Sequence, residues 1–374
     1  MKISLLNIFF LVTILHLSCI DPYNPPEIVA EQEYLVIDGV FHPGEINQVH
    51  LSYTQNLIDE EAPEQVTNAA VSLEVKGDQS YSYENIGNGN YQLMVVDIPF
   101  NTEVRLRVDN NGKEYVSAYV PVLPTPEIDS ISFKAEEDGM QFFVNTGDPQ
   151  NDTWYYRWEY TDTWQFSSVF SSWFEYVNNE VRPRTESIYF CWNSTNSTNI
   201  YVTSTNNLSR DIVSMYPLHK VPANSERLRI KYSLLVKQNA LTREAYDYYR
   251  ELRTNTENLG TLFDPLPFQL NGNFTNVDDP AEPVIGFFYA SETTEKRIFV
   301  NSGDHPYSIP NRFAGSCELD TIAIPDLPEA AKTLLIVDEY IGEFSPEPIG
   351  YLMSTPVCVD CRLYGTNVEP DFWQ

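Results

Sequence analysis

Short segments in which apolar and polar residues alternate constrain the fold of this chain more than any other feature. Seven of them follow one another between residues 34 and 120, and turns rich in Gly and Asn separate several. Alternation at every second residue is typical of a strand with one buried face, and about seven such strands indicate an antiparallel sandwich. The segments are 34–40, 48–53, 70–75, 80–84, 91–95, 103–108 and 114–120.

A Pro-rich stretch, 121–126, marks the best candidate for a domain boundary, because prolines favour a stiff, extended backbone. We expect residues 34–122 to form one sandwich, which resembles immunoglobulin-like or transthyretin-like modules in its strand pattern. Strand patterns resume near Ile128, and residues 302–329 and 342–374 are rich in Pro, Gly and Asp. We therefore expect a second β-rich domain over 127–374 that ends in a loop-rich, cysteine-containing tail.

One helix interrupts the β-rich pattern of the second domain. Apolar residues recur there at spacings of three, four and seven, which places them on one helical face. Thr242 is suited to cap the N-terminus of such a helix. The spacing predicts a helix near 242–256 with its apolar face made by Leu241, Ala245, Tyr248, Tyr249 and Leu252.

The N-terminus has the composition of an export signal. Lys2 precedes an apolar run over 3–17, which is too short to cross a bilayer and ends at Ser18 and Cys19. This end resembles a bacterial lipobox, in which the Cys is diacylated, although Leu15 lies one place further from the Cys than usual. We expect a signal peptide over 1–18, a lipid on Cys19 and a tether over 19–33. A cleaved signal on a freely secreted protein is the alternative.

Charge and aromatic content narrow the class of protein. The chain has 53 acidic and 23 basic residues, a formal net charge of −30. Such a surface repels polyanions, so we exclude nucleic acid as a partner. The 24 Tyr, 20 Phe and 6 Trp argue against disorder and favour strands.

Beyond Cys19 the chain has four further cysteines: Cys191, Cys317, Cys358 and Cys361. In an exported protein an even number of cysteines predicts disulfides, here with three possible pairings. Cys358 and Cys361 also have the spacing of zinc ligands, so a four-thiolate zinc site is the alternative. We prefer a pairing of Cys317 with one of the last two cysteines, because that bond would fix the loop-rich tail.

Aromatic side chains are densest between residues 154 and 176. Tyr156, Trp158 and Tyr160 alternate and are expected to enter a core, whereas 164–176 lacks a clear period and is a candidate exposed loop. Exposed Trp and Tyr side chains stack on sugars and dominate protein-binding hot spots. The candidates for a binding surface are Trp164, Phe170, Trp173, Phe174 and Tyr176.

No catalytic motif or cofactor-binding motif is present. Paired carboxylates occur at 59–61, 136–138 and 278–279, but a chain this acidic contains such pairs by chance. Glycoside hydrolysis needs two carboxyl groups that face each other across a cleft, which spacing alone does not give. Asp148, Asn151 and Asp152 could supply calcium ligands but lack EF-hand spacing. We assign no catalytic residue, metal or cofactor, and a glycan- or peptide-cleaving enzyme remains an alternative.

Nine segments carry a family resemblance: 19–23, 35–39, 128–131, 155–158, 191–192, 231–238, 286–288, 358–362 and 370–373. In this order they resemble the Bacteroidota lipoproteins that contain domain of unknown function 4249. The resemblance implies an outer-membrane lipoprotein that faces the cell exterior, or else the periplasm. It also implies a gene beside that of a TonB-dependent transporter and no known enzymatic activity.

We therefore expect a non-enzymatic outer-membrane lipoprotein that binds a glycan or peptide ligand for a TonB-dependent transporter, or docks on that transporter. A structural or adhesive envelope lipoprotein is the alternative, and it predicts neither a ligand nor a transporter partner.

Overall fold

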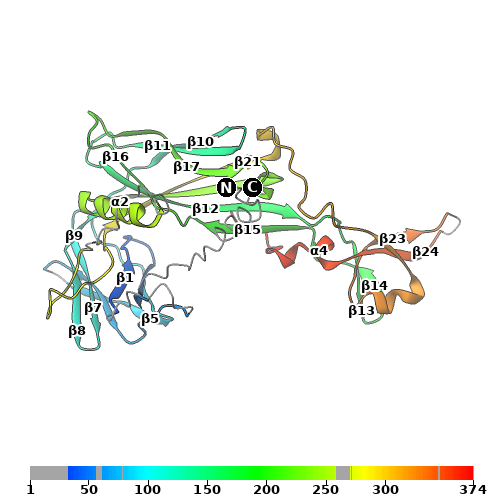
Figure 1. Cartoon of the computed structure of the whole chain (residues 1–374), viewed down its shortest axis with the longest axis horizontal. Coiled ribbons are helices and arrows are strands. Elements are labelled where there is room, and N and C mark those ends of the chain that lie inside the picture. The colour runs from blue at the N-terminus through cyan, green and yellow to red at the C-terminus, as the bar shows by residue number, and fades with distance from the viewer. Residues whose placement is uncertain are drawn as a thin grey trace, which may run out of the picture.

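The computed structural model describes residues 33–55, 61–77, 79–257, 270, 272–343 and 346–373. The described chain is mostly β-structure, as the sequence predicts. It is elongated, with an N-terminal sandwich at one end and a second pair of sheets in the middle (Figure 1). A narrow arm, formed by residues 168–190 and 316–363, extends from the other end (Figure 1).

The N-terminal sandwich contains two sheets. The first consists of β1 (Leu35–Gly39), β2 (Asn47–Tyr53), β5 (Glu84–Gly87) and β6 (Asn90–Leu93). The second consists of β3 (Ala70–Val75), β4 (Ser80–Ser82), β7 (Glu103–Asn110), β8 (Lys113–Ser117), β9 (Val120–Leu123), β19 (Phe274–Asn276) and β20 (Ala290–Ser291). The predicted alternation holds in β7, where Val104, Leu106 and Val108 are buried in the core that both sheets share.

A distant segment, 272–291, completes the N-terminal sandwich. In it, β19 pairs with β8, β20 runs parallel to β9, and Phe288 is buried in the sandwich core. The sequence-based boundaries place these residues in the second domain, whereas the structure joins them to the first. Their apolar side chains complete the core of that sandwich. Local periodicity does not reveal this contact, because it reports which face of a segment is buried and not which distant segment covers it.

The middle of the molecule is a second sandwich. One sheet has the order β10 (Ile128–Ala135), β11 (Gly139–Gly147), β17 (Ile212–Pro222). The other has the order β15 (Phe190–Asn196), β12 (Tyr155–Ser167), β18 (Lys231–Ala240), β21 (Thr293–Asn301), and β16 (Tyr201–Ser204) also pairs with β12. Tyr156 and Trp158 of β12 are fully buried between the sheets, which confirms the prediction that they enter a core; Tyr160 is partly buried against the same core.

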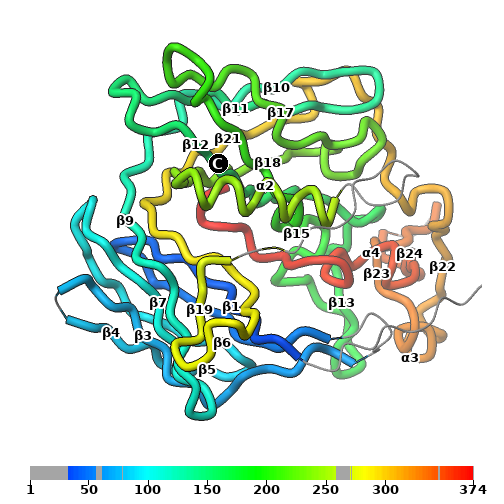
Figure 2. Tube along the Cα trace, turned by 60° about the vertical axis from the view of Figure 1, so that its left-hand side comes forward, coloured from blue at the N-terminus to red at the C-terminus, as the bar shows by residue number. Residues whose placement is uncertain are grey.

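The predicted helix is α2 (Arg243–Glu257), which lies between the two sandwiches (Figure 2). As predicted, Thr242 caps it, because its Oγ1 accepts a hydrogen bond of 3.2 Å from the Ala245 N–H. Tyr248 and Tyr249 pack against Phe287 and Tyr289 of the 272–291 segment. No helix in the described residues is long and apolar enough to cross a membrane.

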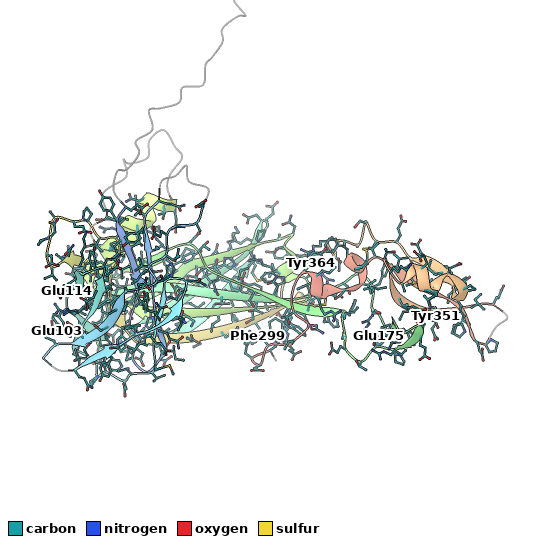
Figure 3. The ribbon with its side chains drawn as sticks, turned by 90° about the horizontal axis from the view of Figure 1, so that it is seen from below. Glu103, Glu114, Glu175, Phe299, Tyr351 and Tyr364 are labelled. Atoms are coloured by element: carbon teal, nitrogen blue, oxygen red, sulfur yellow. A yellow bond between two sulfur atoms is a disulfide. The ribbon has the colours of Figure 1, made fainter. Side chains whose placement is uncertain are left out.

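The arm is more ordered than the loop-rich tail that the sequence predicts. It contains β13 (Phe174–Val177) paired with β14 (Glu180–Pro183), and a sheet of β22 (Asp320–Ala323), β24 (Pro348–Ser354) and β23 (Leu335–Ile341). Short helices flank these strands: α3 (Leu327–Ala330), α4 (Pro356–Val359), η3 (Ile324–Asp326) and η4 (Cys361–Leu363). Two further 3-10 turns, η1 (Glu226–Leu228) and η2 (Ser302–Asp304), belong to the middle of the molecule. Figure 3 shows Glu175 and Tyr351 on the arm, with Glu103 and Glu114 at the opposite end.

Two disulfides hold the arm, Cys191–Cys361 and Cys317–Cys358. The second is of the kind preferred from the sequence, a bond from Cys317 to one of the last two cysteines. Because all four thiols are paired with each other, the zinc alternative does not fit this arrangement.

Candidate functional site: an aromatic pocket on the arm

The five aromatic candidates do not form one exposed loop. Trp164 lies in β12 and packs against the central core, while Phe170 packs beside the Cys317–Cys358 bond. Phe174 and Tyr176 lie in β13 and pack against the arm sheet. Of the five, Trp173 alone is largely exposed, at 65 %. The expected loop is thus confined to residues 168–173, because strands on either side bury the other aromatic rings.

Trp173 forms one wall of a pocket of about 420 Å³. Tyr189 and Phe190 form a second aromatic group, with ring centroids 4.6 Å apart in an edge-to-face arrangement. Between these walls the lining is polar: Ser171, Ser172, Arg184, Glu186 and Ser187. The pocket therefore combines apolar ring faces with a few hydrogen-bonding groups, which is typical of small-ligand sites.

Backbone hydrogen bonds fix the loop that carries Trp173. The carbonyl of Trp173 accepts a bond of 2.8 Å from the N–H of Arg184, and the Ser172 hydroxyl donates a bond of 2.6 Å to the carbonyl of Ile336 in β23. The indole is therefore exposed on a backbone that is held from both sides. A Trp side chain has only two rotatable torsions, so on a fixed backbone it loses little conformational entropy when it binds, which favours its use as an anchor.

Arg184 is the main charged group in the pocket, and its side chain is only 11 % exposed. Its Nε donates to the Ser172 hydroxyl at 3.2 Å, its Nη2 to the Phe174 carbonyl at 3.3 Å, and its Nη1 lies 3.5 Å from a carboxylate oxygen of Glu175. Burial lowers the pKa of the guanidinium while Glu175 opposes the shift, and the group stays protonated at neutral pH. A guanidinium has five N–H donors, so this geometry leaves donors for a ligand oxygen.

Sequence reasoning missed Arg184, Tyr189 and Phe190, because they lie far from the dense aromatic run that it singled out. The adjacent pair of rings at the end of the stretch 184–190 was the available signal. The pairing of Phe190 with Ser167 at the end of β12, together with the hydrogen bond from the Arg184 N–H to the Trp173 carbonyl, brings this stretch beside Trp173.

Of the acidic stretches, 136–138 and 278–279 make ion pairs and turns, and residues 59 and 60 lie outside the described chain. Glu136 and Asp138 both bind Lys220, and the carboxylate of Asp148 accepts backbone N–H groups of residues 150, 152 and 153. Asn151 accepts the N–H of Asp211, which closes the same loop. In the described residues no three His, Cys, Asp or Glu side chains are grouped to hold a metal ion. The predicted lipidation site, Cys19, lies outside the described residues.

Comparison with known proteins identifies a family. No curated protein matches the chain. The family model described as Domain of unknown function (DUF4249) matches residues 20–297, well over half of the sequence. The segments singled out by resemblance, from 35–39 to 286–288, lie inside this match. The chain therefore belongs to the family defined by domain of unknown function 4249.

Proposed function

We propose that this protein is a non-enzymatic binding lipoprotein of the outer membrane, facing the cell exterior, that uses the Trp173 pocket to hold a ligand for, or to contact, a TonB-dependent transporter. The lipid-bearing Cys19 and the tether over 19–33 would keep the body beside the membrane surface. The transporter partner is proposed from the resemblance of the sequence to Bacteroidota lipoproteins.

The exposed indole of Trp173 is the observation that carries the binding role. A large aromatic side chain at 65 % exposure, on a backbone held by hydrogen bonds, leaves apolar surface in water that a partner would cover. The rings of Tyr189 and Phe190, which line the same pocket, suit a flat group such as a sugar ring or an apolar side chain. The Arg184 guanidinium suits a carboxylate or carbonyl oxygen beside that group.

A non-catalytic role agrees with the composition of this pocket. Among the described residues that line it, Glu186 is the one carboxylate, and none is a histidine or cysteine. Glycoside hydrolysis requires two opposed carboxyl groups, and nucleophilic catalysis requires a nucleophile with an adjacent base. Binding needs only the rings and the guanidinium.

Affinity purification of the native, lipidated protein from detergent-solubilised outer membranes tests the proposal. Mass spectrometry would compare the wild type with Trp173→Ala and with Met94→Ala, whose side chain is 61 % exposed on the N-terminal sandwich. We expect a β-barrel transporter to be recovered in equal amount with the wild type and with Met94→Ala, and to be lost with Trp173→Ala.

Two other outcomes would contradict the proposal. Recovery of the protein alone, from the wild type as from Trp173→Ala, would favour a structural or adhesive envelope protein. Recovery of wild-type protein in the soluble fraction would show that Cys19 carries no lipid. Cys19→Ala is the matched control for anchoring, and we expect it to leave the membrane fraction.

A further inference from the structure

A second pocket, of about 500 Å³, lies in the middle of the molecule and shares no lining residue with the Trp173 pocket. It opens where β12, β15 and β17 meet the loop that precedes β16. Its volume lies within the range of about 300–1,000 Å³ that is usual for small-molecule sites. Amide, hydroxyl and phenol groups dominate its lining, among them Gln141, Tyr160, Asn196, Asn199 and Tyr201.

A fully buried carboxylate, that of Asp162, supports one side of this pocket. Arg227 and Thr195, which line the pocket, both donate to it, and Nε2 of His219 lies 3.6 Å from it. Burying a carboxylate without hydrogen-bond partners costs free energy. The negative charge of Asp162 therefore holds these surrounding groups in place. Arg227 is fixed further because its guanidinium stacks 4.5 Å from the ring centroid of Trp164.

His219 is held in the same network. Its Nδ1 lies 2.8 Å from the hydroxyl of Tyr160, and the two rings are 4.3 Å apart. The nearby Asp162 carboxylate favours a hydrogen on Nε2, so Nδ1 accepts from the Tyr160 hydroxyl. Burial and Tyr201 raise the pKa of Tyr160, so it stays a neutral phenol and not a nucleophilic phenolate. The side chains beneath the pocket are thus held in fixed positions by their interactions with one another.

The charges around this pocket are already paired within the protein. Arg227 is matched by Asp162, and Lys220 by Glu136 at 2.9 Å and by Asp138. At the rim, the exposed side chains of Thr198 and Asn199 have no hydrogen-bond partner in the described part of the chain. A ligand would therefore meet neutral donors and acceptors beside phenol and imidazole rings, with no unmatched charge to neutralise.

We propose that this second pocket binds a neutral, hydroxyl-rich ligand of the size of a mono- or disaccharide. Sugar hydroxyls match the amides and hydroxyls of the rim, and the ring of Tyr201 offers an apolar face for sugar C–H groups. A charged ligand would lose its hydration without gaining an unpaired counter-charge, and is disfavoured for that reason.

Isothermal titration calorimetry of the whole protein tests this assignment. The probes are glucose, galactose, mannose, xylose, maltose and cellobiose, with glucuronate and glucosamine as charged comparators. We expect saturable binding of at least one neutral sugar, and weaker binding of the charged comparators. The double variant Thr198→Ala/Asn199→Ala should bind that sugar about thirtyfold more weakly, because two hydrogen bonds of about 1 kcal/mol each are lost.

The matched control is Thr67→Ala/Asn68→Ala, which removes the same two exposed residue types from the N-terminal sandwich and should leave binding unchanged. Asn199→Asp keeps the size of the rim side chain and adds a charge; it should also weaken binding, and thermal unfolding would verify that each variant is folded. The proposal is overturned if no neutral sugar binds saturably, if both rim variants bind like the wild type, or if a charged comparator binds most tightly.

Discussion

Cys191 and Cys361 are joined by a disulfide although 170 residues separate them in the chain. Cys191 lies in β15, which pairs with β12, so this bond attaches the C-terminal segment to the central sheet. Two backbone hydrogen bonds between Trp192 and Thr366, of 2.8 and 3.0 Å, continue the attachment. The other bond, Cys317–Cys358, joins residues only 41 apart and closes the arm on itself. One disulfide therefore links the arm to the body, and the other stabilises the arm alone.

Removal of the first disulfide should cost more stability than removal of the second. Chain entropy gives about 5 kcal/mol for a loop of 170 residues and about 4 kcal/mol for a loop of 41. We expect Cys191→Ser/Cys361→Ser to unfold at lower denaturant concentration than Cys317→Ser/Cys358→Ser when both are measured without reductant. Reductant should remove the difference between the wild type and both variants. The opposite order of midpoints would show that the first bond does not carry the attachment.

Gly286 should be intolerant of any side chain. Its φ is +137°, and a Cβ there would lie 2.0 Å from the carbonyl oxygen of Ile37 in β1. We expect Gly286→Ala to cost about 3 kcal/mol, because the 272–291 segment would have to move off β1. Thermal unfolding would measure the loss. Gly303→Ala is the control, since nothing lies within 4 Å of a Cβ at that position, and an equal loss in both variants would contradict the prediction.

The strands and the helix that depend on a local pattern of apolar residues could be predicted from the sequence. The alternation of Val104, Leu106 and Val108 gave β7, and the spacing of Ala245, Tyr248 and Tyr249 gave α2, because each pattern reports one buried face. The early strands were found for the same reason, with bounds within a few residues of those in the structure.

Contacts between segments that lie far apart in the chain could not be predicted from the sequence. Nothing local in Phe274 or Phe288 indicates that they complete a core begun over two hundred residues earlier. The same holds for the Trp173 pocket, whose second wall is supplied by Tyr189 and Phe190 through the pairing of β15 with β12. Trp164 lies in the long strand β12 and Phe174 in the short strand β13, and whether an aromatic side chain on a strand is buried depends on which neighbour covers that face.

Arg184 should contribute to the stability of the arm as well as to its pocket. Arg184→Ala removes the bonds to Ser172 and Phe174 and leaves their oxygens without that donor, so we expect a loss of about 1–3 kcal/mol. Arg184→Lys should recover only part of it, because an ammonium group lacks the planar fork that reaches both oxygens. Arg182→Ala, at a side chain 58 % exposed that also pairs with Glu175, is the control and should change stability by less than about 1 kcal/mol. Equal losses at both positions in chemical denaturation would contradict this role.

Asp162 should make stability depend on acid pH. Burial raises the pKa of its carboxyl group, but the nearby His219 ring, the hydrogen bond from Thr195 and the charge of Arg227 outweigh burial and hold the pKa below its usual value. A carboxyl group with a depressed folded pKa stabilises the protein above its unfolded pKa of about 3.9, and this contribution is lost as the pH falls through the folded pKa. His219 comes from β17, Arg227 from η1, and the Tyr232 hydroxyl of β18 lies 3.5 Å away.

Asp162→Asn isolates this contribution, because the amide has the same shape but no charge for Arg227. We expect the variant to lose about 3–5 kcal/mol at neutral pH, the cost of breaking a buried ion pair. As the pH falls through the lowered folded pKa, the wild-type carboxyl group also becomes protonated, so the difference in free energy of unfolding between the two proteins should shrink. Asp138→Asn is the control, because that side chain is 74 % exposed and its bond to Lys220 lies at the surface. Urea titrations from neutral to acid pH measure the difference in free energy of unfolding between the wild type and each variant. If the difference between wild type and Asp162→Asn stays constant over this range, the ionised carboxylate is not what stabilises the network.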